Sequence, residues 1–233
     1  MITGAAIRIG KAIAQAFANR GYELAIHYNR SAQEAQGLHR VLTEQGVPCE
    51  LFSADLNDPA QYADLIERAR QRFSNLQVLV NSASIFENAL LKDTEEDLLE
   101  RHLSINLKAP MRLSRDFARQ ISPGHIINIL DQRIEGNHPS YFAYTVSKKA
   151  LADVMQMSAV ELAPDIRVNG IAPGFILPPP GAQTSSLLRL RESIPLRRQG
   201  TLDNIRQAVY YLLDNDYVTG QILYVDGGEH LVR

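Results

Sequence analysis

The sequence predicts a single-domain α/β fold built on a doubly wound parallel sheet. Short apolar runs alternate with longer amphipathic segments along the chain, which is the pattern of strands joined by crossover helices. Two runs, Val78–Val80 and His125–Leu130, are apolar on both faces, as expected for parallel strands covered by helices on both sides. No repeat, charge block or linker divides the 233 residues, so we expect one domain over 1–233.

The strands are predicted, in chain order, at Glu23–His27, Glu50–Ser53, Val78–Val80, His125–Leu130, Arg167–Ile171 and Gln221–Val225. Helical spacing of apolar residues fills most of the intervals, as in the stripes Ile9, Ile13, Ala16, Phe17 and Ala35, Leu38, Leu42. Ser31 with Glu34 predicts a capping box, and Asp58-Pro59 predicts an N-cap followed by proline.

A central strand expected at the very start of the chain, before the glycine turn, fits this fold least well. Only Met1 and Ile2 precede Thr3 and the glycines that follow, whereas a central strand needs a longer apolar run to pair its neighbours' backbone groups. We therefore expect the printed start to lie inside this strand.

Composition excludes several classes of protein. The chain has 24 Lys and Arg against 26 Asp and Glu, a formal net charge of −2, which gives no general attraction to nucleic acid or acidic membranes. A single cysteine, Cys49, excludes an internal disulfide and fits a reducing compartment. No apolar run reaches the ~18 residues of a membrane span, and the N-terminus lacks a signal-peptide pattern. We expect a cytoplasmic protein with no metal, nucleic-acid or membrane partner.

The stretch Pro173–Gly200 interrupts the alternation of strands and helices. It holds five prolines and four serines or threonines, and it follows a strand at the sheet edge where α/β proteins bind ligands. Long loops without secondary structure are usually functional or disordered. We therefore expect a substrate loop at about residues 175–200, with a passive insertion as the alternative.

The chain opens with a glycine turn, Gly4 to Gly10, that leads into the helix carrying Ile13 and Phe17. This arrangement places a pyrophosphate at a helix N-terminus, where free amides and the helix dipole favour anions. The turn departs from the usual three-glycine pattern because Arg8 stands where glycine is common. Alone, it is equally consistent with an ordinary strand–helix connection.

The end of the next strand indicates which nucleotide would bind. It carries His27, Tyr28, Asn29, Arg30 and Ser31, without the acid that accepts a hydrogen bond from the NAD ribose. Arg30 supplies a cation for a 2′-phosphate, and Ser31 opens a helix that can also receive one. Together with the glycine turn, this favours NADP(H) over NAD(H), although a solvated Arg on a helix cap gives the same pattern.

These residues and those that follow resemble the short-chain dehydrogenase/reductase family, which has a Rossmann fold. The matching motifs run in order over nearly the whole chain: "TGAAIRIG", Asp55-Leu56, "NSAS" at Asn81–Ser84, Asn106, Tyr144-x-x-x-Lys148, Pro173-Gly174 and "VDGG". The resemblance implies an NADP(H) site at Gly4, Arg8, Ile9, His27, Tyr28, Asn29, Arg30, Ser31, Asp55, Leu56, Asn81, Ser82, Ala83, Tyr144, Lys148, Pro173, Gly174 and Ile176.

The departures from the family pattern are similar to the pteridine reductases, including the bacterial dihydromonapterin reductases. Arg8 replaces a glycine, Ser84 and Phe86 follow Asn81, and Asp131 stands where the family usually has a catalytic serine. The resemblance implies NADPH-dependent reduction of a pterin, dihydropterin or dihydrofolate-type substrate by a homotetramer. The substrate residues it implies are Arg8, Ser84, Phe86, Asp131, Tyr144 and Gly174.

The implied catalytic residues are Asp131, Tyr144, Lys148 and Asn106. Tyr144 and Lys148 are one helical turn apart, so we expect the ammonium to lower the pKa of the phenol. Asp131 offers acceptor oxygens that suit a ring with amino and N–H groups, and it can pass a proton to Tyr144. By analogy Asn106 steadies a water leading to Lys148, whereas a helix-interior asparagine bonding local backbone is the alternative.

Three alternatives stay open from the sequence. Phe86 is expected either to stack on the substrate ring or to pack as an ordinary apolar side chain beneath the sheet. The enzyme can instead be a 3-oxoacyl or other carbonyl reductase of the same family, against which Asp131 and Arg8 argue. It can also be a non-catalytic NADP(H)-binding sensor, against which the intact Asn106, Tyr144 and Lys148 argue.

Overall fold

The computed structural model describes residues 1–178 and 190–232, and its strands form a parallel sheet. The strands are β1 (Leu24–Tyr28), β2 (Cys49–Ser53), β3 (Val78–Asn81), β4 (Gly124–Ile129), β5 (Ile166–Pro173) and β6 (Ile222–Val225). β1 pairs with β2, and β3 to β6 lie side by side in chain order, all in parallel register. The doubly wound parallel fold is confirmed, and each predicted strand lies within two residues of an observed one.

The beginning of the chain joins the two halves of this sheet. Ile2 forms parallel bridges to Ile26 of β1 and to Val80 of β3. Its amide donates to Ala25 (3.0 Å), and the Thr3 amide donates to Val80 (2.9 Å). This short segment therefore pairs with β1 on one side and with β3 on the other.

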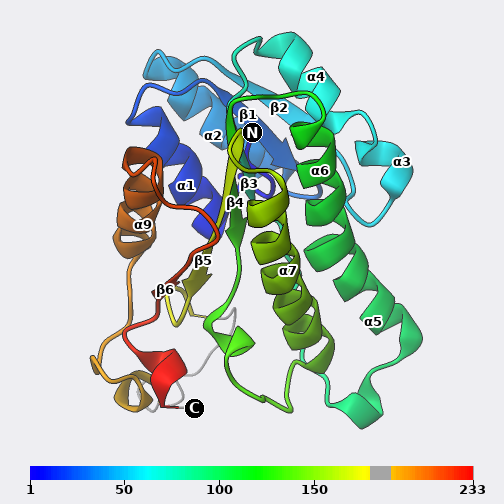
Figure 1. Cartoon of the computed structure of the whole chain (residues 1–233), viewed down its shortest axis with the longest axis vertical. Coiled ribbons are helices and arrows are strands. Elements are labelled where there is room, and N and C mark those ends of the chain that lie inside the picture. Colours follow the sequence, from blue (N-terminus) through cyan, green and yellow to red (C-terminus); the bar gives the residue numbers. More distant parts are fainter. Residues whose placement is uncertain (179–189, 233) are drawn as a thin grey trace.

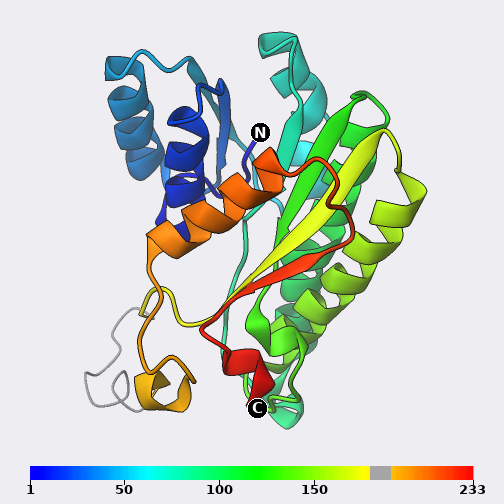
Figure 2. The ribbon, with the colours of Figure 1, turned by 60° about the vertical axis from the view of Figure 1, so that its left-hand side comes forward.

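Helices cover both faces of the sheet (Figures 1 and 2). One face carries α1 (Arg8–Ala18), α2 (Ala32–Glu44) and α9 (Leu202–Asp214), and the other α4 (Leu65–Arg72), α5 (Glu96–Leu103), α6 (Ala109–Ala118) and α7 (Phe142–Glu161). The predicted stripe residues Ile13 and Phe17 lie in the core of the first face, and Leu113, Phe117 and Met155 lie in that of the second. In the described part of the chain, no helix is long and apolar enough to cross a membrane.

The two predicted helix caps have different outcomes. Asp58 caps the short helix α3 (Pro59–Tyr62) by accepting from the Ala60 amide, with Pro59 in the first turn, as predicted. The capping box at Ser31 is wrong, because Ser31 precedes α2 without a side-chain cap bond. Its ψ of 51° is not the extended backbone that turns an N-cap side chain toward the helix amides. The Ser31 hydroxyl and the first backbone amides of α2 therefore remain available to a ligand.

Candidate active site

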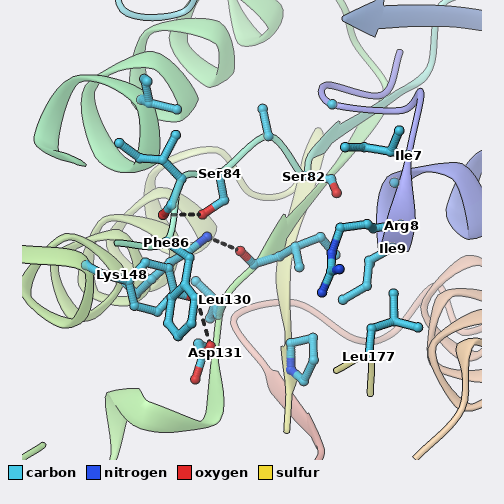
Figure 3. A pocket seen from close by; sticks show the side chains of 18 of the residues that line it. Ile7, Arg8, Ile9, Ser82, Ser84, Phe86, Leu130, Asp131, Lys148 and Leu177 are labelled. Carbon is cyan, nitrogen blue, oxygen red and sulfur yellow. Dashed lines mark hydrogen bonds between the residues drawn. The ribbon is translucent and has the colours of Figure 1, made fainter. Parts of the chain in front are cut away.

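A pocket of about 750 Å³ opens at the carboxyl ends of the strands, the edge where doubly wound sheets bind ligands. Figure 3 shows Phe86, Asp131 and Lys148 gathered on one side of it, with Arg8, Ile9 and Leu177 on the other. The predicted cofactor and substrate residues line this pocket, apart from Asn81. Among the expected catalytic residues, Asp131, Tyr144 and Lys148 line it and Asn106 does not.

The glycine turn packs too closely for side chains. Gly4 has a positive φ of 62°, and a Cβ on it would lie 2.8 Å from the Ala83 Cα. A Cβ on Gly10 would lie 2.1 Å from the Gly4 carbonyl oxygen. Arg8 takes φ 51° without being glycine, and α1 begins there with no side-chain cap. The first amides of α1 are thus open toward the pocket, in the geometry that binds phosphate.

His27 holds this turn in place. Its Nδ1 accepts from the Gly4 amide (3.1 Å), so the proton sits on Nε2, which donates to the Ala54 carbonyl (3.1 Å). Burial lowers the pKa of His27 to about 4, which keeps the ring neutral at physiological pH. His27 therefore ties the glycine turn to the ends of β1 and β2 through both ring nitrogens.

Thr3 has a similar role that sequence reasoning missed. Its Oγ1 accepts from the amides of Ser82 (2.9 Å) and Ala83 (3.1 Å), fixing the turn after β3. Asn81 lies beneath that turn, where its Nδ2 donates to Ser114 (3.1 Å) and Asn128 (2.9 Å). Asn81 therefore braces β3 against β4 and α6 from behind the pocket wall. The available signal for Thr3 was a polar residue placed in an otherwise apolar strand.

Cationic and polar side chains line the pocket mouth beyond β1. Asn29 and Arg30 are exposed there, beside the partly buried Ser31. Across the described ranges, 1–178 and 190–232, Arg30 forms no ion pair, so its guanidinium is available for an anion. Asp55 turns its carboxylate toward the Asn57 amide (2.9 Å), which stiffens the loop after β2.

The other end of the pocket is built around Tyr144. This buried phenol donates to Asp131 Oδ2 (2.7 Å), and Asp131 Oδ1 accepts from the Arg133 amide (2.9 Å). Burial raises the pKa of Tyr144 well above its usual value, and the adjacent Asp131 charge raises it further. The expected lowering by Lys148 is therefore wrong for this structure, because the Tyr144 hydroxyl is buried and faces a carboxylate.

Lys148 lies on the same face of α7 but contacts a different partner. Its Nζ donates to the Ile129 carbonyl (2.7 Å) and lies 5.9 Å from the centre of the Tyr144 ring. Burial lowers the pKa of Lys148 to about 8, although the Asp131 charge opposes the shift. The amine is thus held at the end of β4, next to the Tyr144–Asp131 pair.

Asn106 is fully buried in the π-helical turn η2 (Ser104–Lys108). Its Oδ1 accepts from the Ile85 amide (2.9 Å) and the Ser84 hydroxyl (3.1 Å). Its Nδ2 donates to the Ile85 carbonyl and the Ser147 hydroxyl, both at 3.1 Å. These bonds tie the loop after β3 to α7, so the side chain positions Ser84 and Phe86. The implied water leading to Lys148 stays a prediction.

Phe86 does not pack beneath the sheet, so that alternative is wrong. The ring is 43% exposed and lines the pocket. It stacks on Tyr141 with centroids 4.0 Å apart and meets Tyr144 edge-on at 4.6 Å. Tyr141 has φ 59°, and the Arg133 guanidinium lies 5.2 Å from its ring centre. Sequence reasoning missed both residues, since only their closeness to Asp131 and Tyr144 pointed to them.

The predicted substrate loop is anchored at its described ends. The Gly200 amide donates to Phe175 (3.0 Å), Gln199 Nε2 donates to Ile176 (2.7 Å), and Arg8 reaches the Pro178 carbonyl (3.5 Å). Residues 179–189 lie outside the described part of the chain, so the role of this segment as a substrate loop stays a prediction. In the described ranges no group of His, Cys, Asp and Glu is arranged to hold a metal ion.

Comparison with known proteins agrees with this geometry. The family model described as enoyl-(acyl carrier protein) reductase matches residues 4–230. The 3-oxoacyl-[acyl-carrier-protein] reductase FabG of Staphylococcus epidermidis is 30% identical, over 99% of this chain and 98% of that protein.

Two solved structures are also similar. FolM alternative dihydrofolate reductase 1 from Brucella canis, complexed with NADP, has a TM-score of 0.94 and 35% identity, over 100% of this chain and 93% of that one. A blue fluorescent protein from a metagenomic library, in complex with NADPH, has a TM-score of 0.92 and 31% identity, over 98% of this chain and 96% of that one. The chain, with its glycine turn, Tyr144 and Lys148 around one pocket, therefore belongs to the short-chain dehydrogenase/reductase family of oxidoreductases.

Proposed function

We propose that this protein uses NADPH to reduce a C=N bond of a pterin or dihydropterin, including dihydrofolate-type substrates. The observation that carries the proposal is the Tyr144–Asp131 hydrogen bond at the inner end of the pocket. A carboxylate here accepts hydrogen bonds, so it suits a ring with amino and N–H donors better than it suits a simple ketone. The similarity to FolM alternative dihydrofolate reductase supports the same substrate class.

The residues at the other end fit NADPH. The closely packed glycine turn and the open amides of α1 suit a pyrophosphate. Arg30 and Ser31 suit the 2′-phosphate, and the Lys148 ammonium, which lines the same pocket, suits a ribose hydroxyl. Three similar structures contain NADP or NADPH. When bound, the cofactor supplies the hydride, and the protein contributes binding, orientation and electrostatics.

Tyr144 provides the proton. Because its pKa is raised, Tyr144 is a neutral phenol at physiological pH and can donate to the substrate nitrogen. The C=N bond then gains the hydride at carbon and the phenolic proton at nitrogen. For this step the Tyr144 hydroxyl exchanges its hydrogen bond to Asp131 for one to the substrate nitrogen, and the nearby Lys148 ammonium offsets the negative charge left on the phenolate.

Phe86 suits a flat substrate. Its ring lines the pocket and is stacked on the Tyr141 ring. A flat pterin can pack against this aromatic pair and cover the apolar surface of Phe86 that is now exposed. The bonds of Asn106 to Ser84 and Ile85 hold the Phe86 loop in this position. The loop is thus preorganised for an aromatic ligand.

A 3-oxoacyl or other carbonyl reductase is the second candidate, because FabG is among the relatives. The test compares NADPH oxidation by the protein with 7,8-dihydrobiopterin, dihydrofolate and an acetoacetyl thioester. We expect turnover of at least one dihydropterin-type substrate and little with the thioester. Turnover of the thioester alone would contradict the proposal, and binding of NADPH without any turnover would favour the sensor.

We also infer a homotetramer, formed through the helices at 95–120 and 144–162. Met157 and Val160, three residues apart on α7, are 72% and 82% exposed, so they form an apolar strip that a neighbouring subunit can cover. Light scattering coupled to size-exclusion chromatography measures the assembly, and a monomeric mass would contradict it.

A further inference from the structure

Gln132 is a buried polar residue that the reaction outlined above does not use. It follows Asp131 directly and begins the 3-10 turn η3 (Gln132–Ile134). Its side chain is 3% exposed, yet the residue lines the pocket beside Asp131 and Arg133. Within residues 1–178 and 190–232, its buried carboxamide Oε1 has no hydrogen-bond partner. An unsatisfied buried amide costs stability, so its presence calls for an explanation, and a bound ligand is one.

The surroundings of Gln132 are rich in hydrogen-bond acceptors. Asp131 presents a carboxylate that already holds Tyr144, and η3 packs against the turn η4 (Glu229–Leu231). Glu229 is 2% exposed and lines the same pocket next to Gly174. A ligand that pairs with the open Gln132 Oε1 must therefore bring an N–H donor.

We propose that Gln132 binds the cyclic amide edge of the substrate ring. This inference rests on the proposed pterin reduction. A carboxamide has an acceptor oxygen and a donor nitrogen side by side, so it pairs with a ring N–H next to a C=O. The pyrimidinone half of a pterin has this edge. The reacting end of a 3-oxoacyl thioester offers acceptors only, and it leaves Oε1 unsatisfied.

The side chain is able to present either atom to the ligand. In the part of the chain that the structure describes, no group bonds Oε1, and rotation about the last side-chain torsion exchanges the oxygen and nitrogen positions. Asp131 fixes the backbone before it, by accepting from the Arg133 amide. Gln132 thus combines a fixed attachment with an adaptable end group, and it acts as a specificity residue rather than a catalytic one.

The test compares Gln132→Met with Thr145→Val. Thr145 Oγ1 is also buried without a partner, on α7 beside Tyr144, but Thr145 does not line the pocket. Both variants remove an unsatisfied polar atom, so we expect the melting temperature of the ligand-free protein to stay the same or rise in each. Only Gln132→Met is expected to weaken binding of 7,8-dihydrobiopterin to the NADP⁺-loaded protein, by roughly tenfold in calorimetric titration.

NADPH affinity is expected to be unchanged in both variants. The inference is overturned if Gln132→Met binds dihydrobiopterin as tightly as the unaltered protein, or if Thr145→Val loses the same affinity. It is also overturned if Gln132→Met lowers the melting temperature and NADPH affinity together, which indicates a structural role. The proposed function is tested separately: it fails if the unaltered protein neither binds nor turns over a dihydropterin.

Discussion

The two ends of the pocket are held together in different ways. At the glycine turn, His27 bonds through both ring nitrogens and Thr3 Oγ1 accepts from two amides, so the buried polar groups there serve the fold. At the inner end, Tyr144 has a raised pKa, Gln132 Oε1 is unpartnered and Tyr141 takes a positive φ. The glycine-turn end thus offers a ligand mainly the open backbone amides of α1, whereas the inner end offers it side chains.

This difference assigns separate tasks to the two ends. A nucleotide is bound by open backbone amides and a few cations, which many sequences can supply on the same fold. Choice of substrate requires side chains that are satisfied only by the correct ligand, because leaving them unpaired penalises the wrong one. We therefore expect substitutions at the inner end to change chemistry and substrate choice, and substitutions at the glycine turn to change stability and cofactor affinity.

The largest effect is expected from Tyr144→Phe. Loss of the proton donor is expected to reduce dihydropterin turnover by ~10³-fold, within the range for general acid catalysis. NADPH affinity, measured by fluorescence titration, is expected to stay within about twofold, because the glycine turn and Arg30 are untouched. Unchanged turnover would refute the assignment of Tyr144, and loss of NADPH binding would show that the two ends are not separable.

The stability of the glycine-turn end is expected to depend on His27 and pH. Its pKa is about 4 in the folded protein, against an ordinary value of 6.5. Between these values the unfolded chain binds the proton and the folded chain does not, so stability falls as pH is lowered from 6.5 to 4. The expected loss from His27 is about 3 kcal/mol.

The matched control for that pH dependence is His27→Gln, which does not titrate. Urea unfolding at several pH values is expected to show a shallower decline for the variant than for the unaltered protein. His125, whose pKa is also lowered by burial, to about 3, is present in both proteins, and its contribution cancels. Equal slopes for the two proteins would contradict the role of His27.

The smallest of these effects is expected at Arg30. Removal of its guanidinium in Arg30→Ala is expected to lower the preference for NADPH over NADH by roughly tenfold, since hydrogen bonds to charged groups contribute about 1.5–3 kcal/mol. The change should appear in KM for the cofactor, with kcat for the dihydropterin retained. An unaltered NADPH preference would assign the 2′-phosphate to Ser31 or another group.

Sequence patterns predicted most of this architecture, because strand and helix periodicity and the spacing of Tyr144 and Lys148 are local properties. The direction of the Tyr144 pKa shift was not predictable from that spacing. It depends on the burial of the Tyr144 hydroxyl and on Asp131 facing it, while Lys148 bonds the Ile129 carbonyl. Two other features also depend on neighbours that only tertiary packing brings together. One is the Gln132 Oε1 atom left without a hydrogen bond, and the other is the pair of amide hydrogen bonds that Thr3 Oγ1 accepts.

The central claim is that the carboxylate of Asp131 selects the substrate. The most direct test is the ratio of kcat/KM for 7,8-dihydrobiopterin to kcat/KM for an acetoacetyl thioester, in the unaltered protein and in Asp131→Ser. Serine restores the neutral group usual in the family, so we predict that the ratio falls by roughly tenfold to a hundredfold, the range for a charged hydrogen bond. A ratio that is the same in both proteins would contradict the account.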